Sequence, residues 1–259
     1  MVFCCYRVAK AAQFQSVPAL IRVPMSDQTE APINRLPAIT WALALPMIAM
    51  EVVVNAAANG LVGGPAGIGW RSQAIQDFAF SPDYLRQMLI LWQFPMDGLY
   101  RPFTYAIVHT DVTQAIFVIV ILLALGKFVG EVFRWWAVLA VFLAASLVGA
   151  LVYTAVPYTH GGLIGGYPPV YGLIGAFTYV NWMQAAGAGA ARLRAFKLIG
   201  FLMGFRILFG IFALVAYGYD QSVGWDWTAE LAGFAAGFLL SFAVSPGGWS
   251  RVVAAIRQR

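Results

Sequence analysis

Charged side chains inside apolar stretches are the residues of this sequence most able to do chemistry. Glu51 and Arg206 each lie in the middle of a long apolar run, and Glu230 lies about one helical turn into another. An ionised group is costly in lipid, so such residues serve as hydrogen-bonded structural ties or line a polar path for a substrate. A direct Glu51–Arg206 pair is one arrangement that would satisfy both charges.

Groups typical of metal or nucleophilic chemistry are scarce. The chain has two histidines and no His-Glu-x-x-His motif, so we expect no metal site and no cofactor. Ser146 and Ser241 lie deep in apolar runs, and neither is in a Gly-x-Ser-Gly setting. A serine hydroxyl becomes a nucleophile only beside a base, and neither serine meets that condition.

The composition is that of an integral membrane protein. Of 259 residues, 61% are hydrophobic and 10% are charged, whereas soluble domains carry about 25% charged residues. We expect an all-α bundle of six transmembrane helices, each of about 20 apolar residues. A further short amphipathic helix is expected over 84–92, after the start signal Ser81-Pro82-Asp83. The expected spans are 36–58, 102–127, 134–156, 169–187, 197–217 and 225–244.

The basic residues predict the orientation. Both tails and the loops after the second and fourth spans hold most of the Lys and Arg, while the opposite loops hold Arg71, Arg86 and Arg101. This positive-inside pattern places both termini in the cytoplasm, and a bacterial inner membrane is the expected location. The net charge of +5 is therefore read as membrane topology, and no nucleic-acid partner is expected.

The expected domain organisation has three parts. Residues 1–35 form a cytoplasmic N-terminal tail, of which 1–24 are either untranslated, with Met25 as the start, or disordered. Residues 36–245 form the membrane domain, and residues 246–259 form a basic cytoplasmic tail. The lipid bilayer is thus the first partner that the sequence predicts.

Three segments, in order, resemble the rhomboid family of intramembrane serine proteases. Arg101-Pro-Phe-Thr-Tyr-Ala-Ile-Val-His109 resembles the start of that family's second helix. Gly165-Gly-Tyr-Pro-Pro-Val-Tyr-Gly-Leu-Ile-Gly175-Ala176 resembles Gly-x-Ser-Gly-x-x-Phe/Tyr-Gly-x-x-Gly-Ala, and Ala229-Glu-Leu-Ala-Gly-Phe-Ala-Ala-Gly237 resembles Ala-His-x-x-Gly-x-x-x-Gly. The resemblance covers about 39–244 and implies a six-helix rhomboid-like fold.

The departures from the family pattern fall on its chemistry. Tyr167 stands at the serine position and Glu230 at the histidine position of the dyad. Of the residues that help bind the oxyanion, His109 remains, whereas Gln114 and Val118 replace a histidine and an asparagine. Losing one oxyanion donor costs about 10²–10³ in rate. We therefore expect no catalytic residue, and we expect a hydrogen bond from the Tyr167 phenol to the Glu230 carboxylate.

The glycines of the family pattern are retained. Gly233 and Gly237 form a Gly-x-x-x-Gly motif, and Gly172 and Gly175 lie on the fourth expected span. Small residues let helices approach closely in lipid, so the fourth and sixth spans are expected to pack together.

Three functions of different classes are compatible with these residues. An inactive rhomboid-like protein, or pseudoprotease, would bind transmembrane client proteins for assembly, quality control or retention. An active serine-type endopeptidase of the rhomboid family would need hydrolysis without serine at position 167. A small transporter is suggested only by Glu51, Arg206 and Glu230, and no inverted repeat supports it.

Overall fold

The computed structural model describes residues 35–157, 159, 161–185, 189–217 and 225–247. The expected N-terminal tail, apart from Arg35, and most of the C-terminal tail lie outside these residues. Residues from Leu36 onward group as one unit, separate from residues 1–35. The description below concerns that unit.

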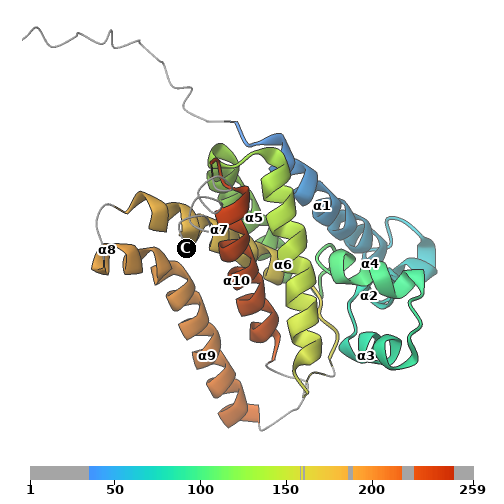
Figure 1. Cartoon of the computed structure of the whole chain (residues 1–259). Helices are drawn as coiled ribbons and strands as arrows, with labels where there is room; N and C mark the ends of the chain where they lie inside the picture. Colours follow the sequence, from blue (N-terminus) through green and yellow to red (C-terminus); the bar gives the residue numbers. More distant parts are fainter. Residues whose placement is uncertain (1–34, 158, 160, 186–188, 218–224, 248–259) are drawn as a thin grey trace, which may run out of the picture. The chain divides into compact units, whose positions relative to one another are not determined.

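Helices dominate the described part of the chain (Figure 1). Those of the first half are α1 (Ala38–Ala58), η1 (Gly64–Gly69), α2 (Trp70–Phe78), α3 (Pro82–Leu91), α4 (Met96–Thr104) and α5 (Val112–Val132). Those of the second half are α6 (Trp135–Ala155), α7 (Tyr167–Gln184), α8 (Ala190–Leu193), η2 (Arg194–Phe196), α9 (Lys197–Tyr217) and α10 (Asp226–Val244).

Four helices, α1, α5, α6 and α10, are long and apolar enough to cross a membrane. Their outward faces carry large apolar side chains that protein does not cover, among them Val52, Phe117, Leu151 and Leu239. In water this surface would be unstable, whereas lipid tails solvate it. The chain is therefore an integral membrane protein of mostly helical structure.

The expected second span, 102–127, is wrong at its start. Its helix, α5, begins at Val112, where the Asp111 carboxylate accepts a hydrogen bond from the Gln114 backbone N–H at 2.9 Å. Pro102 belongs instead to α4, and residues 105–111 connect the two helices, with the side chains of 105, 106, 108 and 109 buried. The error arises because Ala106 and Val108, which are buried in that connection, read as part of a continuous apolar run.

The long connection between α1 and α5 is more helical than the sequence suggested. The amphipathic helix expected over 84–92 is confirmed as α3, and the Ser81 hydroxyl caps it by accepting from the Tyr84 N–H at 3.3 Å. The helices α2 and α4 were not predicted, because short segments of mixed polarity have no clear helical period. An isolated antiparallel bridge between Phe80 and Leu163 joins this connection to the loop before α7.

Three arginines hold this connection in place: Arg71 and Arg86 join it to the rest of the fold, and Arg101 joins two parts of the connection itself. Arg86 of α3 donates to the carbonyl oxygens of Thr154, Val156 and Thr159 at 2.6–3.1 Å. These carbonyls lie at and beyond the C-terminal end of α6, where helical partners run out. Arg101 of α4 donates to the carbonyl oxygens of Gln76 and Ala79 at 2.9 and 3.0 Å.

The third arginine, Arg71 of α2, pairs with Glu51 of α1. Its guanidinium lies 2.5 Å from one Glu51 carboxylate oxygen and 3.2 Å from the other, and it also donates to the His109 carbonyl at 2.9 Å. Glu51 is therefore a structural tie between α1 and α2, and the Glu51–Arg206 pair considered from the sequence is not formed.

The core of the bundle is built on close contact between α7 and α10, with α6 against both. A Cβ added at Gly237 would overlap the carbonyl oxygen of Gly172, and one added at Gly175 would overlap the carbonyl oxygen of Phe234. A Cβ at Gly233 would overlap the carbonyl oxygen of Pro168 in the same way. The two backbones thus touch along their length, which fixes the first turn of α7 against the first turns of α10.

Candidate functional site

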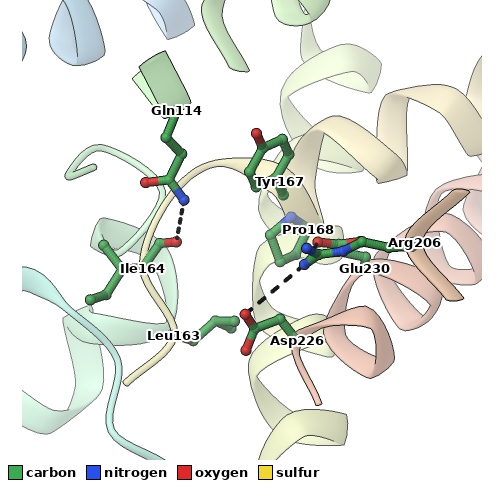
Figure 2. A pocket seen from close by; sticks show the side chains of 8 residues that line it. All are labelled: Gln114, Leu163, Ile164, Tyr167, Pro168, Arg206, Asp226 and Glu230. Carbon is green, nitrogen blue, oxygen red and sulfur yellow. Dashed lines mark hydrogen bonds and ion pairs between the residues drawn. The ribbon is translucent and has the colours of Figure 1, made fainter. Parts of the chain in front are cut away.

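A cavity of about 100 Å³ lies where the first turns of α7 and α10 meet the middle of α9 and the start of α5 (Figure 2). It is lined by Gln114, Leu163, Ile164, Tyr167, Pro168, Arg206, Asp226 and Glu230. The lining therefore combines one amide, one phenol, two carboxylates and one guanidinium. The cavity is large enough for a few water molecules or the end of one side chain.

The Glu230 carboxylate is held by Arg206 of α9. The Arg206 Nε–H donates to Glu230 Oε2 at 3.1 Å, and Nη2 lies 2.5 Å from Oε1, so the pair is bidentate. The Glu230 side chain is 3% exposed and that of Arg206 is 40% exposed. The negative charge of Glu230 on α10 is therefore buried, whereas the positive charge of Arg206 on α9 is partly exposed.

Asp226 places a second carboxylate beside the same guanidinium. Its Oδ2 lies 4.0 Å from Arg206 Nη2, and its Oδ1 accepts from the Tyr153 hydroxyl at 3.4 Å. Asp226 and Glu230 are four residues apart on α10, so they share one helix face. Two carboxylates thus lie against one guanidinium.

The hydrogen bond expected from Tyr167 to Glu230 is not present. Figure 2 shows the Tyr167 hydroxyl pointing away from the carboxylate, which is instead hydrogen-bonded by Arg206 and by the Tyr171 hydroxyl. A guanidinium presents two parallel N–H donors to a carboxylate, and a phenol presents one. The prediction was wrong because Arg206 donates to both carboxylate oxygens, and the phenol that bonds to the carboxylate is that of Tyr171, one turn further along α7.

Gln114 closes the cavity on the α5 side. Its Oε1 accepts from the Thr110 backbone N–H at 2.8 Å and from the Thr110 hydroxyl at 2.9 Å, and its Nε2 donates to the Ile164 carbonyl at 3.2 Å. Gly165, at a φ of +99°, lets the backbone approach this amide, since a Cβ there would lie 2.7 Å from Nε2. The amide is thus committed to protein partners.

Val118 and His109 lie outside the cavity lining. Val118 is fully buried against Gly166. His109 is 2% exposed, and neither ring nitrogen has a hydrogen-bond partner among the described residues. Burial lowers the pKa of His109, with the nearby Glu51 carboxylate opposing that shift.

The arrangement is suited to recognition by charge and hydrogen bonding. Among the described residues that line the cavity there is no serine, threonine, cysteine, lysine or histidine. Tyr167 carries the hydroxyl among these lining residues, and that hydroxyl points away from the Glu230 carboxylate. Among the side chains that line the cavity, none is a hydroxyl in contact with a base, the arrangement that nucleophilic catalysis uses.

Four residues singled out from the sequence, Gln114, Tyr167, Arg206 and Glu230, line this one cavity in the structure. Asp226 was missed, although its spacing of four residues before Glu230 on one helix was a readable signal. The position of Arg206 opposite Glu230 was not readable, since the two side chains come from different helices.

Comparisons with known proteins agree with the fold and the order of these segments. A family model described as the Rhomboid domain matches residues 97–247. No curated protein matches the chain closely enough to be counted as a relative. The matched region covers more than half of the chain and contains α4 to α10. The chain belongs to the rhomboid family.

Proposed function

We propose that this protein is a proteolytically inactive member of the rhomboid family that binds transmembrane segments of client proteins. Its role would be the assembly, quality control or retention of those clients. The observation that carries the proposal is the state of the two dyad positions. Tyr167 turns its hydroxyl away from Glu230, and Arg206 occupies both oxygens of that carboxylate.

The chemistry at these positions disfavours hydrolysis. A phenol is a weak nucleophile unless a base removes its proton, and the nearest candidate base is engaged with a guanidinium. Pro168 has no backbone N–H to offer a developing oxyanion. The Gln114 side chain, at a position where the family has a donor, already donates to Ile164. Donors for a transition state are therefore occupied or missing.

The packing supports a retained binding scaffold. Glycine contacts hold α7 and α10 together with the backbones touching, so the cavity keeps a defined shape without catalytic residues. Beside it, α9 presents several large apolar side chains that no described residue covers, including Phe201, Leu208 and Val215. A transmembrane client helix could cover that face as lipid does.

The proposal includes a topology. We propose that α7 and α9, with 18 and 21 residues, cross the membrane along with the four apolar helices, which makes six spans over 36–245. Both termini would then lie in the cytoplasm of a bacterial cell, with the protein in the inner membrane. Arg71, Arg86 and Arg101 would lie on the outer side, where their ties to backbone carbonyls or to Glu51 explain why they are kept there.

The test of inactivity uses purified protein in liposomes with single-span substrates and a fluorophosphonate probe that labels activated serines. We expect no cleavage product and no labelling. Cleavage of a substrate, together with labelling of any serine of the chain, would show that the protein is an active protease.

The test of binding uses a photoreactive residue at position 208 of α9, compared with one at position 52 of α1. Leu208 and Val52 are similarly exposed, at 63% and 61%, so lipid contact is matched. We expect position 208 to crosslink one reproducible single-span or multi-span membrane protein, and position 52 to crosslink lipid alone. Equal protein capture from both positions would contradict a client site beside α9.

A further inference from the structure

The face between α9 and α10 combines an apolar surface with an unbalanced charge. The backbone of α9 approaches that of η2, and no other described helix packs extensively against it. The side chains of Leu202 and Met203 pack against the hydrophobic core, whereas those of Phe205 and Leu208 are exposed. In Figure 1, α9 runs apart from α10 over much of its length, so something apolar must occupy the space beside it in the membrane.

At the level of the cavity this face is not electrically neutral. Asp226 and Glu230 both lie beside Arg206, and among the described residues Arg206 is the cation that pairs with either of them. Its two donors to Glu230 are short, whereas its approach to Asp226 is 4.0 Å. One carboxylate is therefore well compensated, and the other is held loosely.

The loosely held carboxylate is also the accessible one. The Asp226 side chain is 49% exposed, compared with 3% for Glu230. The hydrogen bond that Asp226 accepts from the Tyr153 hydroxyl is long, at 3.4 Å. In the proposed topology Asp226, the first residue of α10, lies at the edge of the membrane. A carboxylate there attracts a second cation, because charge compensation strengthens as the surroundings become less polar.

We infer that the partner of this face is a transmembrane helix bearing a basic residue, Lys or Arg, at the level of Asp226. The inference rests on the proposed function and names the chemistry of the client. The apolar residues of the client would lie against Phe205 and Leu208, and its basic side chain would reach Asp226 at the rim of the cavity. Arg206 would stay on Glu230, so the two carboxylates would each have one cation.

This choice of occupant follows from charge complementarity. An acidic client residue would place a third carboxylate beside Asp226 and Glu230, with one guanidinium shared among them. A wholly apolar helix would leave Asp226 uncompensated next to lipid. A basic residue is the client group that satisfies the charge already present.

The experiment uses the full-length protein in liposomes, with a photoreactive residue at position 208 and three synthetic single-span helices. The helices are identical apart from one position near the outer end, which is Leu, Lys or Glu. We expect the Lys helix to crosslink about tenfold more than the Leu helix, and the Glu helix less than the Leu helix, as coupling between close charge pairs at interfaces allows.

Two variants of Asp226 make the result specific. Asp226→Asn should bring the Lys helix down to the level of the Leu helix, and Asp226→Lys should reverse the preference toward the Glu helix. Asp77→Asn on α2 is the matched control, because it also replaces an exposed aspartate by asparagine but lies in the connection between α1 and α5. It should leave the preference for the Lys helix unchanged. Retention of the folded fraction in each variant is checked by size-exclusion chromatography in detergent.

The outcomes separate this inference from the proposed function. Equal crosslinking of the Lys and Leu helices, or no effect of Asp226→Asn, would overturn recognition of a basic residue while leaving client binding supported. If none of the three helices crosslinks to the wild-type protein, both the inference and the client site beside α9 are wrong. A reversed preference with Asp226→Lys would support the inference even if Asp226→Asn unfolds.

Discussion

The ion pair between Arg206 and Glu230 gives the sharpest prediction for stability. Replacing Arg206 by Met leaves the Glu230 carboxylate, with its side chain 3% exposed, without a cation. Removing one partner of a buried pair costs about 3–5 kcal/mol. Arg206 is 40% exposed, so water reaches the site and weakens the interaction. We expect Arg206→Met to lower the free energy of unfolding by about 2 kcal/mol.

The reverse substitution should cost less. Glu230→Gln leaves Arg206 with Asp226 at 4.0 Å and with partial access to water, so about 1 kcal/mol is expected. The double variant should lose about 1–2 kcal/mol less than the sum of the single losses, because neither charge is then left alone. Unfolding by increasing SDS in mixed micelles measures all three values.

A second pair provides the control for this cycle. Tyr167→Phe and Glu230→Gln should be additive, because the Tyr167 hydroxyl points away from the carboxylate. Strict additivity of Arg206→Met with Glu230→Gln would refute the ion pair. Coupling between Tyr167→Phe and Glu230→Gln would instead indicate a hydrogen bond between Tyr167 and Glu230, contrary to the orientation of the Tyr167 hydroxyl.

Three further predictions concern the scaffold. Gly237→Ala should destabilise the protein by about 2 kcal/mol or more, because its Cβ would meet the Gly172 carbonyl. Gly204→Ala on α9, with nothing near its Cβ, should be neutral, and equal losses of the two variants in thermal unfolding would contradict the packing of α7 on α10. Arg86→Lys should cost about 1–2 kcal/mol, since an ammonium cannot reach the carbonyls of Thr154, Val156 and Thr159 together; retained wild-type stability would count against this tie. Burial lowers the pKa of His109, so the unfolded chain binds the proton more readily than the folded chain. The contribution of neutral His109 to stability is therefore present above the ordinary pKa of about 6.5 and is lost as the pH falls toward the folded-state pKa. As the pH is lowered from 7.5 to 5, the free energy of unfolding should therefore fall more steeply for the wild type than for His109→Gln. Parallel curves for the two proteins would contradict this role of His109.

Much of the helical architecture could be predicted because hydropathy and helix boundaries agree. The helices α1, α6, α9 and α10 begin and end within about two residues of the expected spans. The start of α5 was misplaced because the apolar residues Tyr105, Ala106 and Val108 are buried in protein, and hydropathy does not distinguish that from burial in lipid. The helices α2 and α4 lack any such signal.

The candidate site was predicted as far as the family pattern reaches. The glycine spacing of α7 and α10 sets the register that brings Tyr167 and Glu230 to one cavity. The charge partners were beyond the sequence, because Arg71 lies on the unpredicted α2 and Arg206 on a helix whose rotation no motif fixes. Glu51 and Arg206, considered as a pair from the sequence, instead pair with Arg71 and Glu230 respectively.

The packing and the charges of this bundle act on different helices, which makes their roles separable. Backbone contact at Gly172, Gly175, Gly233 and Gly237 joins α7 to α10 and does not involve α9. The hold on α9 comes from Arg206 and from a few apolar contacts such as those of Leu202 and Met203. A variant of one of these glycines should therefore lower stability without changing which client residue is preferred. Asp226→Asn should change that preference with little loss of stability, because the interaction of Asp226 with Arg206 is long and exposed. A neutral histidine at position 230 would need no cation, but a glutamate buried there does. Arg206 and Glu230 thus compensate each other's charge, and Asp226 is the carboxylate that we propose a partner compensates.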